Sequence, residues 1–113
     1  MVVAAHMRPG DIWIVHIPQL GTHEQSGTRP AVIVARVTKN IVTIIPCTSN
    51  ELALRFPFTC ALKPSKKNGL RIPSVALVFH LRAIDVSYLE VKIGRLDPAT
   101  LRKIRSLARQ LIG

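Results

Sequence analysis

The hydrophobic periodicity of this chain changes once, and the change limits the folds that the chain can adopt. Up to residue 94, short apolar runs rich in valine and isoleucine alternate with segments that contain proline, glycine or asparagine, a pattern typical of short antiparallel strands. From Asp97-Pro98 onward, apolar residues recur at helical spacing, after an aspartate cap and a proline at the first helical position. Five or six strands followed by one C-terminal helix predict a mainly β (α+β) fold, a small closed or half-closed barrel.

The expected strands are short and are bounded by turn residues. They are Asp11–Ile17, Pro30–Val37, Ile41–Cys47, Phe58–Leu62, Ser74–His80 with a continuation over Ala83–Asp85 after a bend, and Leu89–Gly94. Segments 19–28 and 48–56 are predicted to be loops, and segment 63–70 to be a basic hairpin tip that turns at Asn68-Gly69. Pro46 indicates an edge or a bulge near the end of the third strand, because proline cannot donate to a ladder.

The length and composition indicate one folded domain. The chain has 113 residues, of which 48% are hydrophobic and 19% are charged, so it can bury a core without disulfides or metals. We assign residues 8–113 to this domain and set residues 1–7 apart as a flexible or added N-terminal segment. That segment is weakly apolar but lacks a basic start, so we do not interpret it as a signal peptide.

The net charge favours an anionic partner. Lysine and arginine total 16, aspartate and glutamate total 6, and the formal net charge is +10. A field of this sign attracts polyanions, with nucleic acid as the first candidate, an anionic membrane surface as the second and an acidic protein as the third. The alternative is a charge that only keeps a basic protein soluble.

Cysteine usage and hydropathy predict a cytoplasmic protein. Cys47 and Cys60 lie in apolar segments and fit neither a metal pair nor a disulfide scaffold, so buried free thiols in a reducing cytoplasm are expected. No stretch is long enough to cross a membrane, and His16 and His80 are not spaced like a metal site. We therefore expect no metal, no other cofactor and no membrane partner.

Two polar segments stand out between the strands. One is His23-Glu24-Gln25-Ser26-Gly27-Thr28-Arg29-Pro30, which leads into the second strand, and the other is Pro46-Cys47-Thr48-Ser49-Asn50, which follows the third. An antiparallel pair places the end of one strand beside the start of its neighbour, so Arg29 should lie near Thr48. Either segment could also be an ordinary surface loop, because hydroxyls after a strand are more often turn formers than catalysts.

These segments resemble those of the MazF/PemK/Kid toxins. The resemblance begins at Pro9-Gly10-Asp11-Ile12-Trp13, passes through Gly21 and the two polar segments, and continues at Gly69-Leu70, Ser74-Val75, Leu81-Arg82-Ala83-Ile84-Asp85 and Gly94-Arg95-Leu96. It covers residues 8–113, and its specific part is the block 23–30 followed by Pro46-Cys47-Thr48. The resemblance implies an SH3-like barrel with a C-terminal helix, a homodimer, and RNA bound in a groove at the dimer interface.

The resemblance also implies an activity and partners. The expected protein is the toxin of a type II toxin–antitoxin system, a sequence-specific endoribonuclease that cuts single-stranded RNA (mRNA) without a metal. Attack by the RNA 2′-hydroxyl would leave a cyclic phosphate and a 5′-hydroxyl. The implied partners are an acidic, MazE-like antitoxin and, only as the toxin–antitoxin complex, operator DNA. The family's catalytic arginine and threonine correspond to Arg29, which would bind the phosphate, and Thr48, which would donate its hydroxyl to the same oxygen.

One part of the family pattern is missing from this chain. One branch of the family uses an arginine and an aspartate where this chain has Leu77 and Phe79, and many members carry an acidic residue and a glutamine at Phe79-His80. A mechanism that uses that arginine and aspartate is therefore excluded. Arginine is a poor base, so we consider His23 as a third catalytic residue, with a loop histidine that only contacts RNA as an equal alternative.

Other polar residues are candidates for contacts with RNA. They are Glu24, Gln25, Ser49, Arg55, Lys63, Lys66, Lys67, His80 and Arg82. For any single lysine among them, a solvated surface position is the stronger interpretation. Two other functions stay open. One is a gyrase poison like CcdB, whose fold is similar but which lacks the arginine–threonine pair, and the other is a nucleic-acid-binding or autorepressor subunit without catalysis.

Overall fold

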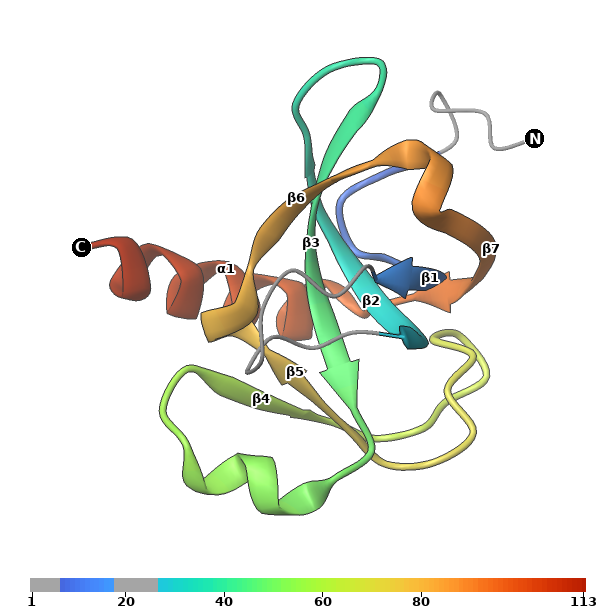
Figure 1. Ribbon diagram of the computed structural model, residues 1–113. Helices are drawn as coiled ribbons and strands as arrows, with labels where there is room; N and C mark the ends of the chain where they lie inside the picture. Colours follow the sequence, from blue (N-terminus) through green and yellow to red (C-terminus); the bar gives the residue numbers. More distant parts are fainter. Residues whose placement is uncertain (1–6, 18–26) are drawn as a thin grey trace.

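The computed structural model describes residues 7–17 and 27–113, which form a strongly curved antiparallel sheet with a helix at its side (Figure 1). The strands are β1 (Asp11–Ile17), β2 (Gly27–Arg36), β3 (Ile41–Thr48), β4 (Thr59–Leu62), β5 (Ser74–Leu77), β6 (Arg82–Asp85) and β7 (Leu89–Arg95). Short 3-10 helices are η2 (Glu51–Arg55), η3 (Val78–His80) and η4 (Val86–Tyr88), and the α-helix α1 spans Pro98–Ile112. The prediction of a mainly β fold with a C-terminal helix is confirmed.

The strand β3 lies at the centre of the sheet. The strand order is β4-β5-β3-β2-β1-β7, and β6 pairs with β3 outside this path. One side of β3 pairs with β2, while on the other side residues 41–44 pair with β6 and residues 47–48 pair with β5. Pro46 therefore lies where β3 passes from one partner to the other, a local edge at which a missing N–H is tolerated.

Both faces of the sheet are buried. Neighbouring residues such as Ile44 and Ile45 point to opposite faces and belong to two separate hydrophobic clusters. The cluster of Ile45 includes Ile104 and Ala108 of α1, so the helix covers that face. Burial on both faces explains why the strands are nearly continuous apolar runs rather than alternating ones.

The helix α1 begins as the sequence predicts. Asp97 accepts hydrogen bonds from the Thr100 backbone N–H at 3.0 Å and from the Thr100 hydroxyl at 2.7 Å, and Pro98 lies in the first turn. These bonds lower the pKa of the Asp97 carboxyl, because they favour its charged form. Across the residues that the structure describes, no helix is long and apolar enough to cross a membrane.

Several boundaries differ from the predicted ones. Residues 51–55 form η2 rather than a loop, because the Asn50 side chain caps this turn by accepting from the Leu52 N–H at 3.1 Å. The strand β5 ends at Leu77, since residues 78–80 turn as η3 before β6. The strand β2 begins at Gly27 rather than at residue 30. Met7 is 3% exposed and packs in the second cluster, so it belongs to the packed domain and not to the segment set apart.

Candidate active site

Thr48, the last residue of β3, lines two surface cavities of about 540 and 550 Å3. The first, which we call the polar cavity, is lined by Ile14, Thr28, Arg29, Pro30, Cys47, Thr48, Ser49, Gly69, Leu70, Arg71, Ile72, Ser74 and Ile93. The second, the aromatic cavity, is lined by Thr48, Asn50, Leu52, Ala53, Arg55, Phe56, Pro57, Phe58, Leu77, Phe79 and His80. The two cavities therefore meet at the end of the central strand.

The predicted proximity of Arg29 and Thr48 is confirmed. The ladder between β2 and β3 ends where Ala31 pairs with Pro46. Arg29 and Thr48 each lie two residues beyond this pair, at the same end of the two antiparallel strands. Both side chains line the polar cavity, and Ser49 lines it beside them. The pairing of the two strands thus brings both residues to one cavity.

The polar cavity has the composition of an anion site. Its lining supplies two guanidinium groups and four hydroxyls, and no carboxylate comes from the residues that the structure describes there. These groups belong to Arg29, Arg71, Thr28, Thr48, Ser49 and Ser74. A guanidinium fork matches phosphate oxygens, and hydroxyls can donate to the same atoms.

The Thr48 hydroxyl is held in place by the backbone that follows it. Its oxygen accepts a hydrogen bond from the Asn50 N–H at 3.2 Å. Because the oxygen is the acceptor in this bond, its own hydrogen remains available to donate to a ligand. At the rim of the cavity, His16 is exposed, and its Nδ1 lies 3.4 Å from the Thr28 hydroxyl.

Cys47 forms an unreactive part of the cavity floor. It is a free cysteine, 1% exposed, and burial is the main cause that raises the pKa of its thiol to about 12. Cys60 raises this pKa further, and the charge of Arg29 lowers it only in part. The thiol is therefore protonated at neutral pH and is a poor nucleophile.

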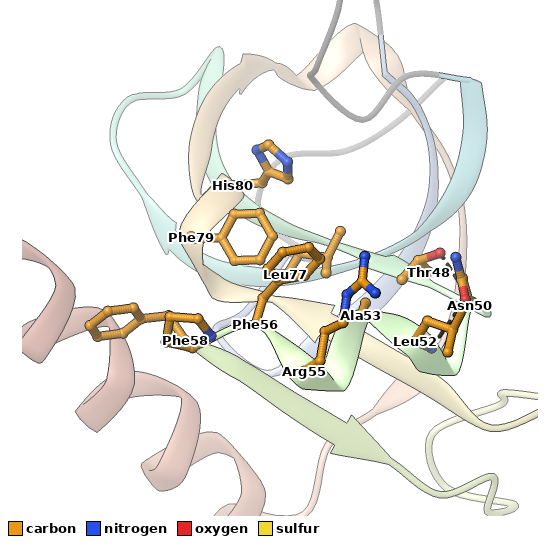
Figure 2. Close-up of a pocket in the computed structure, with 11 residues that line it drawn as sticks. Thr48, Asn50, Leu52, Ala53, Arg55, Phe56, Phe58, Leu77, Phe79 and His80 are labelled. Carbon is orange, nitrogen blue, oxygen red and sulfur yellow. Dashed lines mark hydrogen bonds between the residues drawn. The ribbon is translucent and has the colours of Figure 1, made fainter.

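The aromatic cavity gathers all three phenylalanines of the chain, Phe56, Phe58 and Phe79. Figure 2 shows the rings of Phe56 and Phe79 near His80, the Phe58 ring apart from them on the side of α1, and Arg55 and Thr48 farther along the cavity. The ring of Phe79 lies 4.5 Å from that of His80 and 6.1 Å from that of Phe56, measured between centroids. The Arg55 guanidinium lies 5.1 Å from the centre of the Phe56 ring. Exposed rings and a cation of this kind form surfaces on which unpaired bases stack.

Other predicted residues are not brought to these cavities. Lys66 and Lys67 lie in the turn between β4 and β5. Arg82 is the first residue of β6 and pairs with Ile44 of β3. Lys63 lines a third cavity, which contains Asp97. His23, Glu24 and Gln25 lie outside the described residues, so their predicted roles stay predictions.

Two groups of cavity residues are not predicted from the sequence. Phe56 and Phe58 flank Pro57 at the end of a segment predicted to be a loop. Two phenylalanines so close together in a chain with few aromatic residues are the sequence feature that points to an aromatic surface there. Phe58 also has a φ of +58°, a rare conformation for a bulky residue that often marks functional segments. Arg71 was missed because it belongs to the polar cavity only through the way the β4–β5 connection folds.

Within residues 7–17 and 27–113, histidine, cysteine and carboxylate side chains form no group of three that could hold a metal ion. The fold and the cavities define a class: a small curved-sheet protein with a C-terminal helix and a cavity lined by arginines and hydroxyls at the end of its central strand. Residues 8–112 match the family described as PemK-like, MazF-like toxins of type II toxin–antitoxin systems, and the chain belongs to this family.

Individual relatives agree with this membership. The chain is 31% identical over 107 residues to the protein named endoribonuclease MazF9 of Mycobacterium tuberculosis, covering 87% of this chain and 89% of that protein. The crystal structure of MazF from Deinococcus radiodurans superimposes with a TM-score of 0.81 at 24% identity, over 100% of this chain and 99% of that one. A MazE–MazF structure from the same organism gives a TM-score of 0.66 at 29% identity, over 92% of each chain. These likenesses confirm the predicted type of barrel.

Proposed function

We propose that this chain is a toxin that cuts single-stranded RNA at specific sequences without a metal ion. The observation that supports this most strongly is that Arg29 and Thr48 line the same cavity, which is rich in hydroxyls. The 31% identity to a protein named as an endoribonuclease supports the same activity. The basic character of the chain, with a net charge of +10, suits a polyanionic substrate.

The proposed reaction uses a nucleophile that the RNA itself supplies. The 2′-hydroxyl attacks the adjacent phosphorus, a new P–O bond closes the cyclic phosphate, and the bond to the 5′ oxygen breaks. Arg29 and the Thr48 hydroxyl donate hydrogen bonds to the phosphate oxygens as negative charge builds up in the transition state. Preorganised donors of this type are typically worth ~3–4 kcal/mol each.

Two protons must also move in this reaction. One leaves the attacking 2′-hydroxyl, and one reaches the departing 5′ oxygen. We propose His23 as the residue that accepts the first proton, because imidazole titrates near neutral pH. It belongs to the segment that leads into Gly27, at the start of the strand that carries Arg29.

The aromatic cavity would bind bases next to the cleaved bond. We propose that His80 and Arg55 contact RNA there together with the exposed rings, and that Ser49 contacts it in the polar cavity. The contacts predicted for Glu24, Gln25, Lys66, Lys67 and Arg82 stay predictions.

We also propose the assembly and the partners. The toxin would act as a homodimer in the cytoplasm, where an acidic antitoxin segment competes with RNA for the basic groove. The MazE–MazF complex of Deinococcus radiodurans is a solved example of such a pair in a similar protein. Operator DNA would be bound only by the toxin–antitoxin complex.

The test is cleavage by pure protein in EDTA. We expect the wild-type chain to cut single-stranded RNA, and Arg29→Ala and Thr48→Ala to abolish cutting, while Arg36→Ala, at the far end of the same strand, leaves it unchanged. Sequencing the new 5′ ends reads the cleavage motif. Cutting that survives both changes would remove the assigned site, and RNA binding without cutting would favour a binding module instead.

A further inference from the structure

The connection between β4 and β5, residues 63–73, packs tightly against β7. A Cβ atom at Gly94 would collide with backbone atoms of this connection, and a Cβ atom at Gly69 would collide with the Ile93 carbonyl. Gly69 also has a φ of +71°, which glycine adopts without strain. The connection therefore lies in direct backbone contact with the sheet and forms a fixed wall.

Asn68 holds this wall from within. Its side-chain amide donates to the Lys63 carbonyl at 2.8 Å, and its side-chain oxygen accepts from the N–H groups of Ser65 at 3.0 Å and Leu70 at 2.9 Å. Asn68 and Leu70 are each 7% exposed, and Leu70 belongs to the hydrophobic cluster under α1. Because Arg71 follows Leu70 directly, the core fixes the point from which its side chain starts.

The charge of Arg71 is not neutralised by the described part of the protein. Arg95 and Lys92 contact the buried Asp11 carboxylate at 2.7 and 3.4 Å. Arg71, by contrast, makes no ion pair with any described residue. It is exposed and lines the same cavity as Arg29 and Thr48. A guanidinium group that starts from an anchored backbone, pairs with no described carboxylate and lies beside a row of hydroxyls is suited to bind an anion.

We infer that Arg71 is a second phosphate-binding residue of the polar cavity. It takes a phosphate next to the one held by Arg29 and Thr48, so that two arginines from different parts of the fold fix the RNA backbone. In Figure 1 this connection lies beside the start of β2, which carries Arg29. The inference rests on the proposed function for its substrate, since it names the group that binds the neighbouring phosphate.

The first experiment measures binding without cleavage. The probe is a short, mixed-sequence 2′-O-methyl RNA, whose blocked hydroxyl cannot attack, titrated at several salt concentrations. A charge-assisted contact of this kind predicts that Arg71→Ala weakens binding about tenfold at low salt. The slope of log affinity against log salt should fall by about 0.7, the value for one phosphate contact on a single strand. Arg71→Lys should keep the slope but recover only part of the affinity, because it lacks the fork.

The matched controls are exposed lysines elsewhere in the fold that are not candidates for RNA contacts. Lys39→Ala and Lys103→Ala remove one charge each from residues that line neither cavity, and each should change affinity less than twofold. Thermal unfolding of every variant should match that of the wild type, since these side chains are exposed. The inference is overturned if Arg71→Ala behaves like the lysine variants, or if all three weaken binding equally through their net charge.

A cleavage assay separates this inference from the proposed function. On a cut RNA, Arg71→Ala should raise KM about tenfold and change kcat less than twofold, because the contact is made before and during the reaction. If the wild type never cuts RNA, the proposed function fails, and binding of the 2′-O-methyl probe still decides the role of Arg71. If the wild type cuts and Arg71→Ala alters neither binding nor KM, the inference alone fails.

Discussion

The polar and aromatic cavities share Thr48 but are built from different parts of the fold. The polar cavity is formed by paired strand ends and by a connection packed on β7, so the backbone that carries its charged groups is anchored. The aromatic cavity is formed mainly by the short turns η2 and η3, and it exposes 48% of Phe56 and 37% of Phe79. The first arrangement suits phosphate chemistry, which needs fixed donors, and the second suits stacking on bases.

This difference indicates how the two tasks can change independently. Substitutions in η2 and η3 alter an exposed surface without disturbing the ladder between β2 and β3. Leu77 and Phe79 replace the arginine and the aspartate used by one branch of the family, and both line the aromatic cavity. The departure from the family pattern therefore falls on the surface proposed to read bases and leaves the Arg29–Thr48 pair intact.

The largest predicted effect comes from Thr48, the residue that both cavities share. Thr48→Val keeps the shape of the side chain but removes the hydroxyl, and we expect kcat to fall about 100- to 1,000-fold with little change in RNA binding. Thr48→Ser should keep most of the activity. The control is Thr43→Val, which lies on β3 away from both cavities. If Thr48→Val reduced affinity instead of kcat, the residue would serve recognition rather than chemistry.

The next effect comes from the contact between Gly94 of β7 and the β4–β5 connection. This connection lines the polar cavity but not the aromatic one. Gly94→Ala introduces a Cβ atom that collides with the backbone of the β4–β5 connection, and overpacking of this kind costs roughly 1–3 kcal/mol. Urea unfolding measures the loss of stability, and the cleavage motif should stay the same while the rate falls. Glu90→Ala is the control, because Glu90 is an exposed residue of the same strand, β7. Equal losses in both variants would show that the connection is not a fixed wall.

The third effect concerns the aromatic cavity alone. Phe79→Ala removes a stacking surface, so affinity for cleavable RNA should fall by about 1–3 kcal/mol. The cleavage motif should broaden, while kcat at saturating RNA changes little. Tyr88→Ala is the matched control, because Tyr88 is also 37% exposed but lines neither cavity. An unchanged motif after Phe79→Ala would contradict a role of this surface in sequence selection.

The polar cavity was easier to predict from the sequence than the aromatic one. The proximity of Arg29 and Thr48 follows from two consecutive strands in one hairpin, and the start of α1 follows from a local cap at Asp97. The aromatic cavity joins Phe56 to Phe79, which are far apart in the sequence and meet only after η2 and η3 have formed. Patterns of neighbouring residues do not contain that information.

The position of Arg71 shows the same limit. Its place in the polar cavity depends on the packing of Asn68 and Gly69 against Ile93 and Gly94. The Asn68-Gly69 pair predicts a turn, but it does not show which surface the turn packs on. Only the tertiary contact with β7 converts a basic hairpin tip into a wall of the site.

The smallest predicted effect tests whether burial raises the pKa of the Cys47 thiol, which lines the polar cavity. Burial raises the pKa of this thiol from its ordinary value of 9.0 to about 12. Between these values the unfolded chain loses the thiol proton while the folded chain keeps it, so the unfolded state is favoured as pH rises. The free energy of unfolding should therefore fall by up to ~1.4 kcal/mol per pH unit above pH 9, with no such loss below it.

The measurement is urea unfolding of the wild type and of Cys47→Ala at pH 8 and pH 10. The wild type should lose about 1.4 kcal/mol more than the variant between these pH values. Cys60, whose pKa burial also raises, is present in both proteins, so its contribution cancels in the comparison. If both proteins lost the same stability, the Cys47 thiol would ionise as readily in the folded chain as in the unfolded one. Cys47 would then be a thiolate close to Arg29, and it would have to be considered beside the Thr48 hydroxyl as a reactive group of the polar cavity.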